Sequence, residues 1–214
     1  MKLINNKTLT FIAMSIPLFF ILIPYGNAAS VRKVSMDEML QQCQFVFEGN
    51  VIALESKENE QKRIHTYATF EIIDVIKGDY FGETITLSFL GGTVGEVTMA
   101  VSAMKLPELG EHGIYFVESL ERSQVHPLYG WSQGHFLVEG NDTGTNLVMT
   151  NNKQPVIEMV NGQINPNQDS VQALSNGVAR GLILSQGERN SRGLSAKEFK
   201  NALRERLGAL SEKN

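Results

Sequence analysis

One serine stands in a setting that hydrolases use for a nucleophile. The segment 130–134 reads GWSQG and matches G-x-S-x-G, in which the serine sits on a sharp turn between a strand and a helix. The residues after this segment predict a strand, not a helix, and His135 is too close along the chain to act as the distal base of that fold. A catalytic triad whose residues follow another order along the chain remains an alternative, and its base would be His65, His112 or His126. A serine hydrolase using Ser132 is therefore the alternative interpretation, and no residue is assigned as catalytic.

Residues that could hold a metal or a cofactor are scattered along the chain. The four histidines show neither the H-E-x-x-H pattern nor a close pair, and Cys43 is the only cysteine. One cysteine cannot form a cysteine-rich zinc site. The glycines at 91, 92 and 95 lack the Lys-Ser/Thr pair of a phosphate-binding loop. The sequence predicts neither a metal site nor a cofactor.

A short predicted loop gathers the side chains best suited to recognition. It contains His126, Tyr129 and Trp131, the chain's only tryptophan. Exposed aromatic side chains commonly anchor interfaces. We expect these three residues to form a binding surface, although the sequence equally allows Trp131 to pack in the core. Binding of a carbohydrate or small ligand through Tyr129 and Trp131 is a further alternative.

The elements that must position these residues are mostly strands. The clearest is 84–89, where Ile85, Leu87 and Phe89 alternate with polar residues. Gly49 predicts a bulge inside another strand. The remaining strands are expected at 45–53, 65–76, 96–103, 114–118, 135–139, 147–150 and 156–160. Many short strands separated by turns favour a closed or partly closed antiparallel barrel, with a sandwich as the alternative.

Helices are expected at both ends of this β region. The capping box S-x-x-E occurs at 35–38 and again at 195–198. The first predicts a short helix over 36–42. The second starts a helix with an apolar stripe at Phe199, Leu203 and Leu207, which Gly208 should end. The stretch 170–184 is also expected to be helical, with interruptions. We divide the chain into a signal peptide (1–29), a β-barrel domain (30–160) and a helical C-terminal extension (161–214).

The first 29 residues have the layout of an export signal. Lys2 and Lys7 precede an uncharged stretch over 11–23, whose 13 residues match the ~7–15 of a signal-peptide core and fall short of the ~20 of a membrane-spanning helix. Small residues at 26 and 28–30 allow cleavage, and an uncleaved anchor is the alternative. We expect a periplasmic or secreted protein without stable membrane insertion.

The charge of the mature chain limits its partners. Removal of residues 1–29 takes away two of 19 basic residues and none of 23 acidic ones, leaving a net charge of −6. Nucleic acids and anionic lipids are bound through basic patches, so neither is expected as a partner.

The segment 39–120 resembles the netrin-module superfamily, best known from the N-terminal domain of the tissue inhibitors of metalloproteinases. The shared order is a short helix with QQC at 41–43, the strand FVFEGNVIALES, a long strand ending in VIKG at 75–78, the strand ETITLSFL, a glycine-rich corner, and Gly110-Glu111 before IYFVES. A wider group of exported bacterial proteins is similar in the same way. The resemblance implies an OB-like five-stranded barrel with a helix against it.

The inhibitory mechanism of that family does not carry over with the fold. Those inhibitors chelate the target zinc through an N-terminal cysteine, whereas this mature chain begins near Ser30 without one. The sequence thus favours an exported, non-catalytic binding protein whose partner is another exported protein. Modulation of a protease is the form of binding that the resemblance implies.

Overall fold

The computed structural model describes residues 31–122, 124–140, 144–160, 174–185 and 193–212. The expected signal peptide lies outside the described residues, as do 161–173 and 186–192. Within the described ranges, no helix has both the length and the apolar character needed to cross a membrane.

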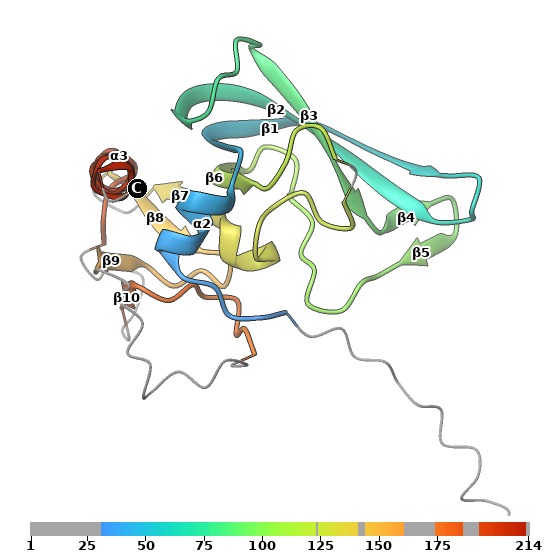
Figure 1. Ribbon diagram of the computed structural model, residues 1–214. Coiled ribbons are helices and arrows are strands. Elements are labelled where there is room, and N and C mark those ends of the chain that lie inside the picture. The colour runs from blue at the N-terminus through green and yellow to red at the C-terminus, as the bar shows by residue number, and fades with distance from the viewer. Residues whose placement is uncertain (1–30, 123, 141–143, 161–173, 186–192, 213–214) are drawn as a thin grey trace, which may run out of the picture.

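A six-stranded antiparallel sheet forms the centre of the molecule (Figure 1). The strands pair in the order β3-β2-β1-β6-β7-β8. Their bounds are β1 Phe45–Glu58, β2 Ile64–Lys77, β3 Thr84–Leu90, β6 His112–Val117, β7 His135–Gly140 and β8 Asn146–Thr150. Two ribbons are added: β4 (Gly92–Val94) with β5 (Val97–Met99), and β9 (Val156–Met159) with β10 (Leu182–Leu184). The mainly β prediction is confirmed, while β3 and β8 do not pair with each other, so the sheet is open.

The middle of the sheet is buried on both faces. Phe45 and Phe47 of β1 belong to one apolar cluster, together with residues of β2, β3 and β6. Val46, which points the other way, belongs to a second cluster that contains residues of both helices. Burial on both faces explains why β1 begins, and β6 ends, with a continuous apolar run instead of strict alternation.

The predicted bulge at Gly49 is confirmed. The register between β1 and β2 shifts between Glu48 and Gly49. A Cβ at Gly49 would lie 2.5 Å from the carbonyl oxygen of Glu71, so only glycine lets the two strands approach here.

Both capping boxes begin helices as predicted. Helix α2 spans Met36–Gln42 and α3 spans Ala196–Ser211. The predicted stop at Gly208 is wrong, because α3 continues through it for three more residues. Leu207 and Leu210 both pack against the core, so burial of the last turn extends the helix past the glycine.

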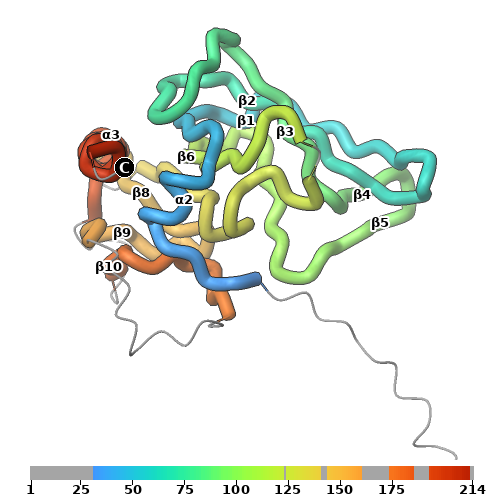
Figure 2. The backbone as a smooth tube through the Cα atoms, viewed as in Figure 1, coloured from blue at the N-terminus to red at the C-terminus, as the bar shows by residue number. Residues whose placement is uncertain are grey.

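The prediction of an interrupted helix over 170–184 is wrong for its described part. Residues 174–185 are extended: they form β10 and isolated bridges from Leu174 to Arg32 and from Arg180 to Ser35. The physical reason is the backbone at Gly177 and Gly181, whose φ angles of 86° and 88° are incompatible with a right-handed helix. Figure 2 shows this segment in orange, passing beside the blue start of the described chain.

Replacing Gly208 by alanine is expected to stabilise the protein. The position is helical and a Cβ there would have no atom within 4 Å, so alanine removes the entropic cost of glycine, about 0.5–1 kcal/mol. Urea unfolding of the mature chain measures the change. The matched control is Gly181→Ala, which must destabilise because its φ is positive. Destabilisation by Gly208→Ala would show that α3 ends earlier.

Candidate functional site

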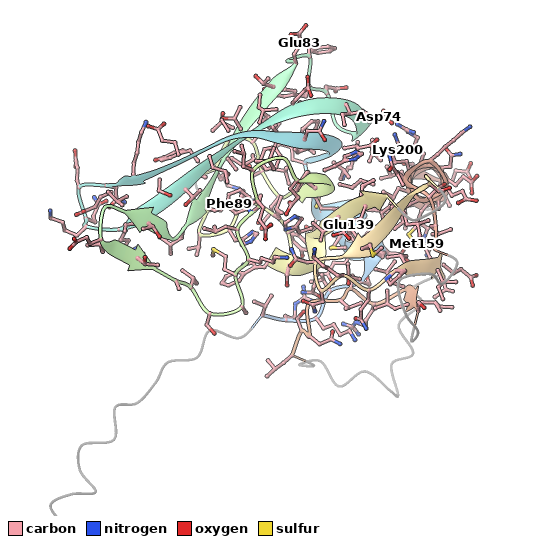
Figure 3. The ribbon with its side chains drawn as sticks, turned by 180° about the vertical axis from the view of Figure 1, so that it is seen from behind. Asp74, Glu83, Phe89, Glu139, Met159 and Lys200 are labelled. Atoms are coloured by element: carbon pink, nitrogen blue, oxygen red, sulfur yellow. The ribbon has the colours of Figure 1, made fainter. Side chains whose placement is uncertain are left out.

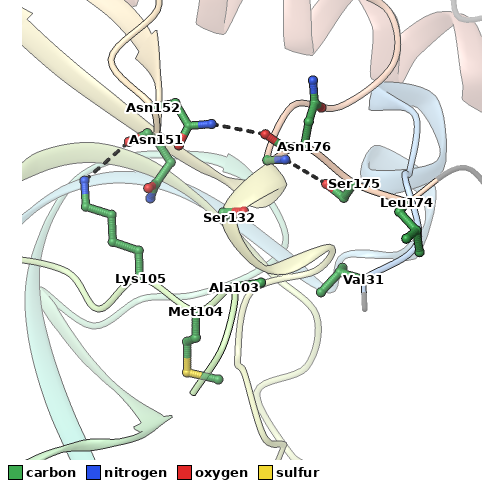
Figure 4. A pocket seen from close by; sticks show the side chains of 11 residues that line it. Val31, Ala103, Met104, Lys105, Ser132, Asn151, Asn152, Leu174, Ser175 and Asn176 are labelled. Carbon is green, nitrogen blue, oxygen red and sulfur yellow. Dashed lines mark hydrogen bonds between the residues drawn. The ribbon is translucent and has the colours of Figure 1, made fainter. Parts of the chain in front are cut away.

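A cavity of about 510 Å³ lies between five parts of the chain that are distant in sequence (Figure 4). They are Val31 at the start of the described chain, the loop at 103–105, the 3-10 helix η2 (Trp131–Gly134), the turn after β8, and the segment 174–177. The polar side chains of the lining are Lys105, Ser132, Asn151, Asn152, Ser175 and Asn176. Its volume falls within the ~300–1,000 Å³ range of ligand sites.

Strained backbone surrounds this cavity. Ala103, which lines it, has a φ of 62°, and Trp131 and Lys153, each next to a lining residue, have φ angles of 59° and 60°. Side-chain-bearing residues adopt this left-handed region at an energetic cost, and such residues concentrate at functional sites. The strain marks the cavity wall as a candidate functional site.

Gln133 fixes η2 to the start of the described chain. Its side chain is buried; Oε1 accepts a hydrogen bond from the Val34 amide at 2.9 Å, and Nε2 donates to the carbonyls of Arg32 and Gly130 at 3.0 Å each. The segment that would begin the mature protein therefore runs along the cavity rim, where Val31 lines it. Gln133 of the GWSQG motif thus has a structural role, which we did not predict from the sequence.

A chain of buried hydrogen bonds supports the opposite wall. Nε2 of His135 lies 2.6 Å from Oε1 of Glu111, and its Nδ1 lies 2.6 Å from the Asn151 side-chain nitrogen. With the amide as donor, Nδ1 accepts and Nε2 donates to the carboxylate. His135 and Glu111 side chains are only 1% and 8% exposed, so the chain holds Asn151 firmly at the cavity.

The same chain sets the ionisation of its members. Burial would raise the pKa of Glu111, but the hydrogen bonds from His135 and Tyr115 outweigh it and hold this pKa below its ordinary value. The pKa of the Tyr115 phenol is raised, first by burial and then by the adjacent carboxylate. The buried carboxylate is therefore charged near neutral pH and oriented by two donors.

Ser132 lies in the cavity wall, but the structure does not place it in a nucleophile elbow. It belongs to η2, which precedes strand β7, whereas the elbow needs a strand before the serine and a helix after it. Both ring nitrogens of His135 are engaged by Glu111 and Asn151. In the described part of the chain, the Ser132 hydroxyl makes no hydrogen bond to any histidine.

The three residues expected to form a recognition surface do not lie on one exposed face. His126 is 3% exposed and stacks beneath the partly exposed Trp131, with ring centroids 5.5 Å apart. Burial lowers the pKa of His126 to about 3, so its ring is neutral. Tyr129 is partly buried and donates its hydroxyl to Glu38 at 2.8 Å. The pair of His126 and Trp131 thus supports η2, while Tyr129 joins it to α2.

A second polar cluster joins helix α3 to the sheet. Lys200 pairs with Glu48 of β1 and with Asp74 of β2, the latter at 2.6 Å, and Figure 3 labels Asp74 and Lys200 side by side. Glu48 also binds Nε2 of His112 at 2.9 Å. The described ranges contain no group of three His, Cys, Asp or Glu side chains that could hold a metal ion. The salt bridges of Lys200 attach α3 to β1 and β2.

Comparison of the chain with protein-family models, curated proteins and solved structures finds no match.

Proposed function

We propose that this chain is an exported, non-catalytic binding protein that recognises another exported protein at the cavity beside Ser132. The observation that supports this most is the buried chain from Glu111 through His135 to Asn151. It fixes a polar cavity wall and engages both ring nitrogens of His135 in positioning, so this histidine is not available as a base for Ser132. Pre-ordered polar groups of this kind favour binding, because less side-chain freedom is lost when a ligand arrives.

The lining suits a polypeptide segment with amide or acidic groups. Lys105 donates to the Asn151 carbonyl at 3.3 Å and keeps further N–H donors for a ligand. Asn152 uses its nitrogen on the Asn176 carbonyl at 3.1 Å, which leaves its amide oxygen as an acceptor. The Lys105 donors and the Asn152 acceptor both line the cavity, and a peptide backbone can bind them through its C=O and N–H groups.

An OB-like barrel of the netrin type is the fold that we propose for this function. The backbone amide of Leu90, at the end of β3, donates to the Val125 carbonyl at 3.3 Å, which brings the open edge towards the segment that precedes η2. The sequence resemblance supports modulation of an exported protease as the form of binding. Signal-peptide cleavage near Ala29 and location in the periplasm or medium belong to the same proposal.

Affinity capture with two variants of one residue tests this proposal. Mature chain 30–214 is immobilised, exposed to the periplasmic and culture fractions of the source organism, and its bound proteins are identified by mass spectrometry. Ser132→Tyr, which obstructs the cavity, should abolish capture of the specific partner, whereas Ser132→Ala should retain it because the hydroxyl makes no hydrogen bond to another described residue. Capture that survives Ser132→Tyr would place the partner elsewhere and contradict the proposal.

The same pair of variants separates the alternatives. A serine hydrolase, which the place of Ser132 in the cavity favours, would lose its activity with Ser132→Ala as well as with Ser132→Tyr. A carbohydrate site would instead show quenching of Trp131 fluorescence by a glycan, and Trp131→Ala would remove the binding.

A further inference from the structure

A groove follows the free edge of β3, away from the cavity at Ser132. Its volume is about 320 Å³, and it lies between the middle of β3 and residues 119–122 and 124–127. On the strand side it is lined by Ile85, Thr86, Leu87 and Ser88, and Leu120 and Pro127 add apolar surface opposite. A strand edge inside a groove is a place where another polypeptide can pair.

The direction of the backbone groups on β3 follows from its two ends. The Leu90 amide donates to Val125 and the Thr84 carbonyl accepts from the Tyr80 hydroxyl at 2.7 Å, so both residues point away from β2. In an antiparallel pair this direction alternates with every residue. The N–H and C=O groups of Thr86 and Ser88 therefore also point into the groove.

The outward backbone groups at the two ends of β3 have hydrogen-bond partners, whereas those in its middle have none among the described residues. Leu90 and Thr84 are occupied as described, whereas no backbone partner is found within the described ranges for the outward groups of Thr86 and Ser88. Gln124, which also lines the groove, has a buried Oε1 that lacks a donor among the described residues. Alternating donors and acceptors are thus left without partners along one line.

We propose that this groove binds one extended polypeptide segment of another protein, which adds a strand to β3. Such a segment supplies the matching backbone groups at every second residue, which a sugar or lipid does not. Arg122 is the charged side chain that the described lining contains. It is 70% exposed and its Nη2 lies 3.4 Å from Oε1 of Glu118, and its remaining N–H donors can meet an acidic side chain of the segment.

The test uses one substitution that removes a single backbone donor. Thr86→Pro deletes an N–H that points away from β2 and leaves the pairing with β2 intact; Thr86→Val is the matched control with the N–H kept. The probes are fluorescein-labelled heptapeptides of alternating valine and threonine with one aspartate. Fluorescence anisotropy should show saturable binding to the mature chain, about tenfold weaker for Thr86→Pro and unchanged for Thr86→Val.

Circular dichroism shows whether Thr86→Pro folds. If it does not fold, two further measurements still test the proposal. Peptides N-methylated at alternate residues should lose binding in one methylation register only. Arg122→Glu should reverse the preference for aspartate over lysine peptides. Absence of binding by every peptide, or equal binding by both methylation registers, would overturn the proposal.

The oligomeric state and the cavity variant distinguish peptide binding at this groove from self-association and from binding at the cavity. A dimer in sedimentation experiments that Thr86→Pro dissociates would mean that a second copy occupies the edge, and would also overturn the proposal. Ser132→Tyr should leave peptide binding unchanged, so failure at the cavity and failure at the groove are distinguishable.

Discussion

Replacing Glu111 by alanine is expected to lower the free energy of unfolding by about 2–6 kcal/mol, because it leaves two buried hydrogen-bond donors without an acceptor at about 1–3 kcal/mol each. His135, 1% exposed, would lose the acceptor that lies 2.6 Å from its Nε2. The Tyr115 hydroxyl would lose its acceptor too. Urea unfolding of the mature chain, with and without the substitution, measures the loss.

Glu111→Gln is the matched control, because it keeps an acceptor oxygen and removes only the charge. Its expected cost is smaller, about 1–3 kcal/mol. The folded-state pKa of Glu111 is lowered, so its charge stabilises the fold above the ordinary value of 4.5 and this contribution is lost as the pH falls below it. The difference in stability between wild type and Glu111→Gln should therefore shrink between pH 7 and pH 3. A difference that stays constant with pH would show that folding leaves the pKa of Glu111 unchanged, and a difference that grows as the pH falls would show that folding raises this pKa.

The substitution also tests the link between the buried chain and binding. Asn151 is held at the cavity by His135, and His135 is held by Glu111. Glu111→Gln, if folded, should therefore weaken partner capture less than Ser132→Tyr does. A Glu111→Gln protein that captures nothing would instead make the charge itself part of recognition.

Local signals in the sequence predicted those elements whose cause is local. Ser35 and Ser195 begin helices because each hydroxyl accepts a hydrogen bond from the backbone amide three residues on. The glutamate completes the box at Ser195, whereas the Glu38 carboxylate binds Arg32 and Tyr129. The alternation of β3 predicted its inward face, and Gly49 predicted the bulge. We did not predict the extended course of 174–185. It depends on left-handed backbone at Gly177 and Gly181, and the sequence does not tell which φ angle a glycine adopts.

The candidate site was only partly predictable, since it is assembled from distant residues. Glu111 and His135 are 24 residues apart and meet because β6 and β7 pair with Tyr115 opposite His135. Nothing local in the sequence marks that register. Ser132 was noticed for its motif, yet the motif's most connected side chain is Gln133, which binds three backbone groups. A glutamine between a turn glycine and a strand was the available signal, and it suggested no particular role.

Replacing Phe199 by alanine is expected to cost about 3–5 kcal/mol, the range for removing a buried aromatic ring from a packed core. Phe199 is fully buried, and its ring lies 5.1 Å from that of Phe136 on β7. Arg204→Ala is the control on the same helix. Its side chain is 41% exposed and pairs with Asp74, so its loss should cost less than about 1 kcal/mol. Urea unfolding compares the two.

The stability loss measured for Phe199→Ala shows whether α3 belongs to the folded core or is free to bind a partner. In the structure, Phe199 and Leu203 of its apolar stripe are buried against the chain's own sheet. A large loss for Phe199→Ala in the isolated chain means that this stripe is already occupied. Partner recognition must then use other surfaces, such as the cavity at Ser132 and the edge of β3. A loss below about 1 kcal/mol, no more than a surface pair contributes, would mean that α3 contributes little to the fold and is free to bind elsewhere.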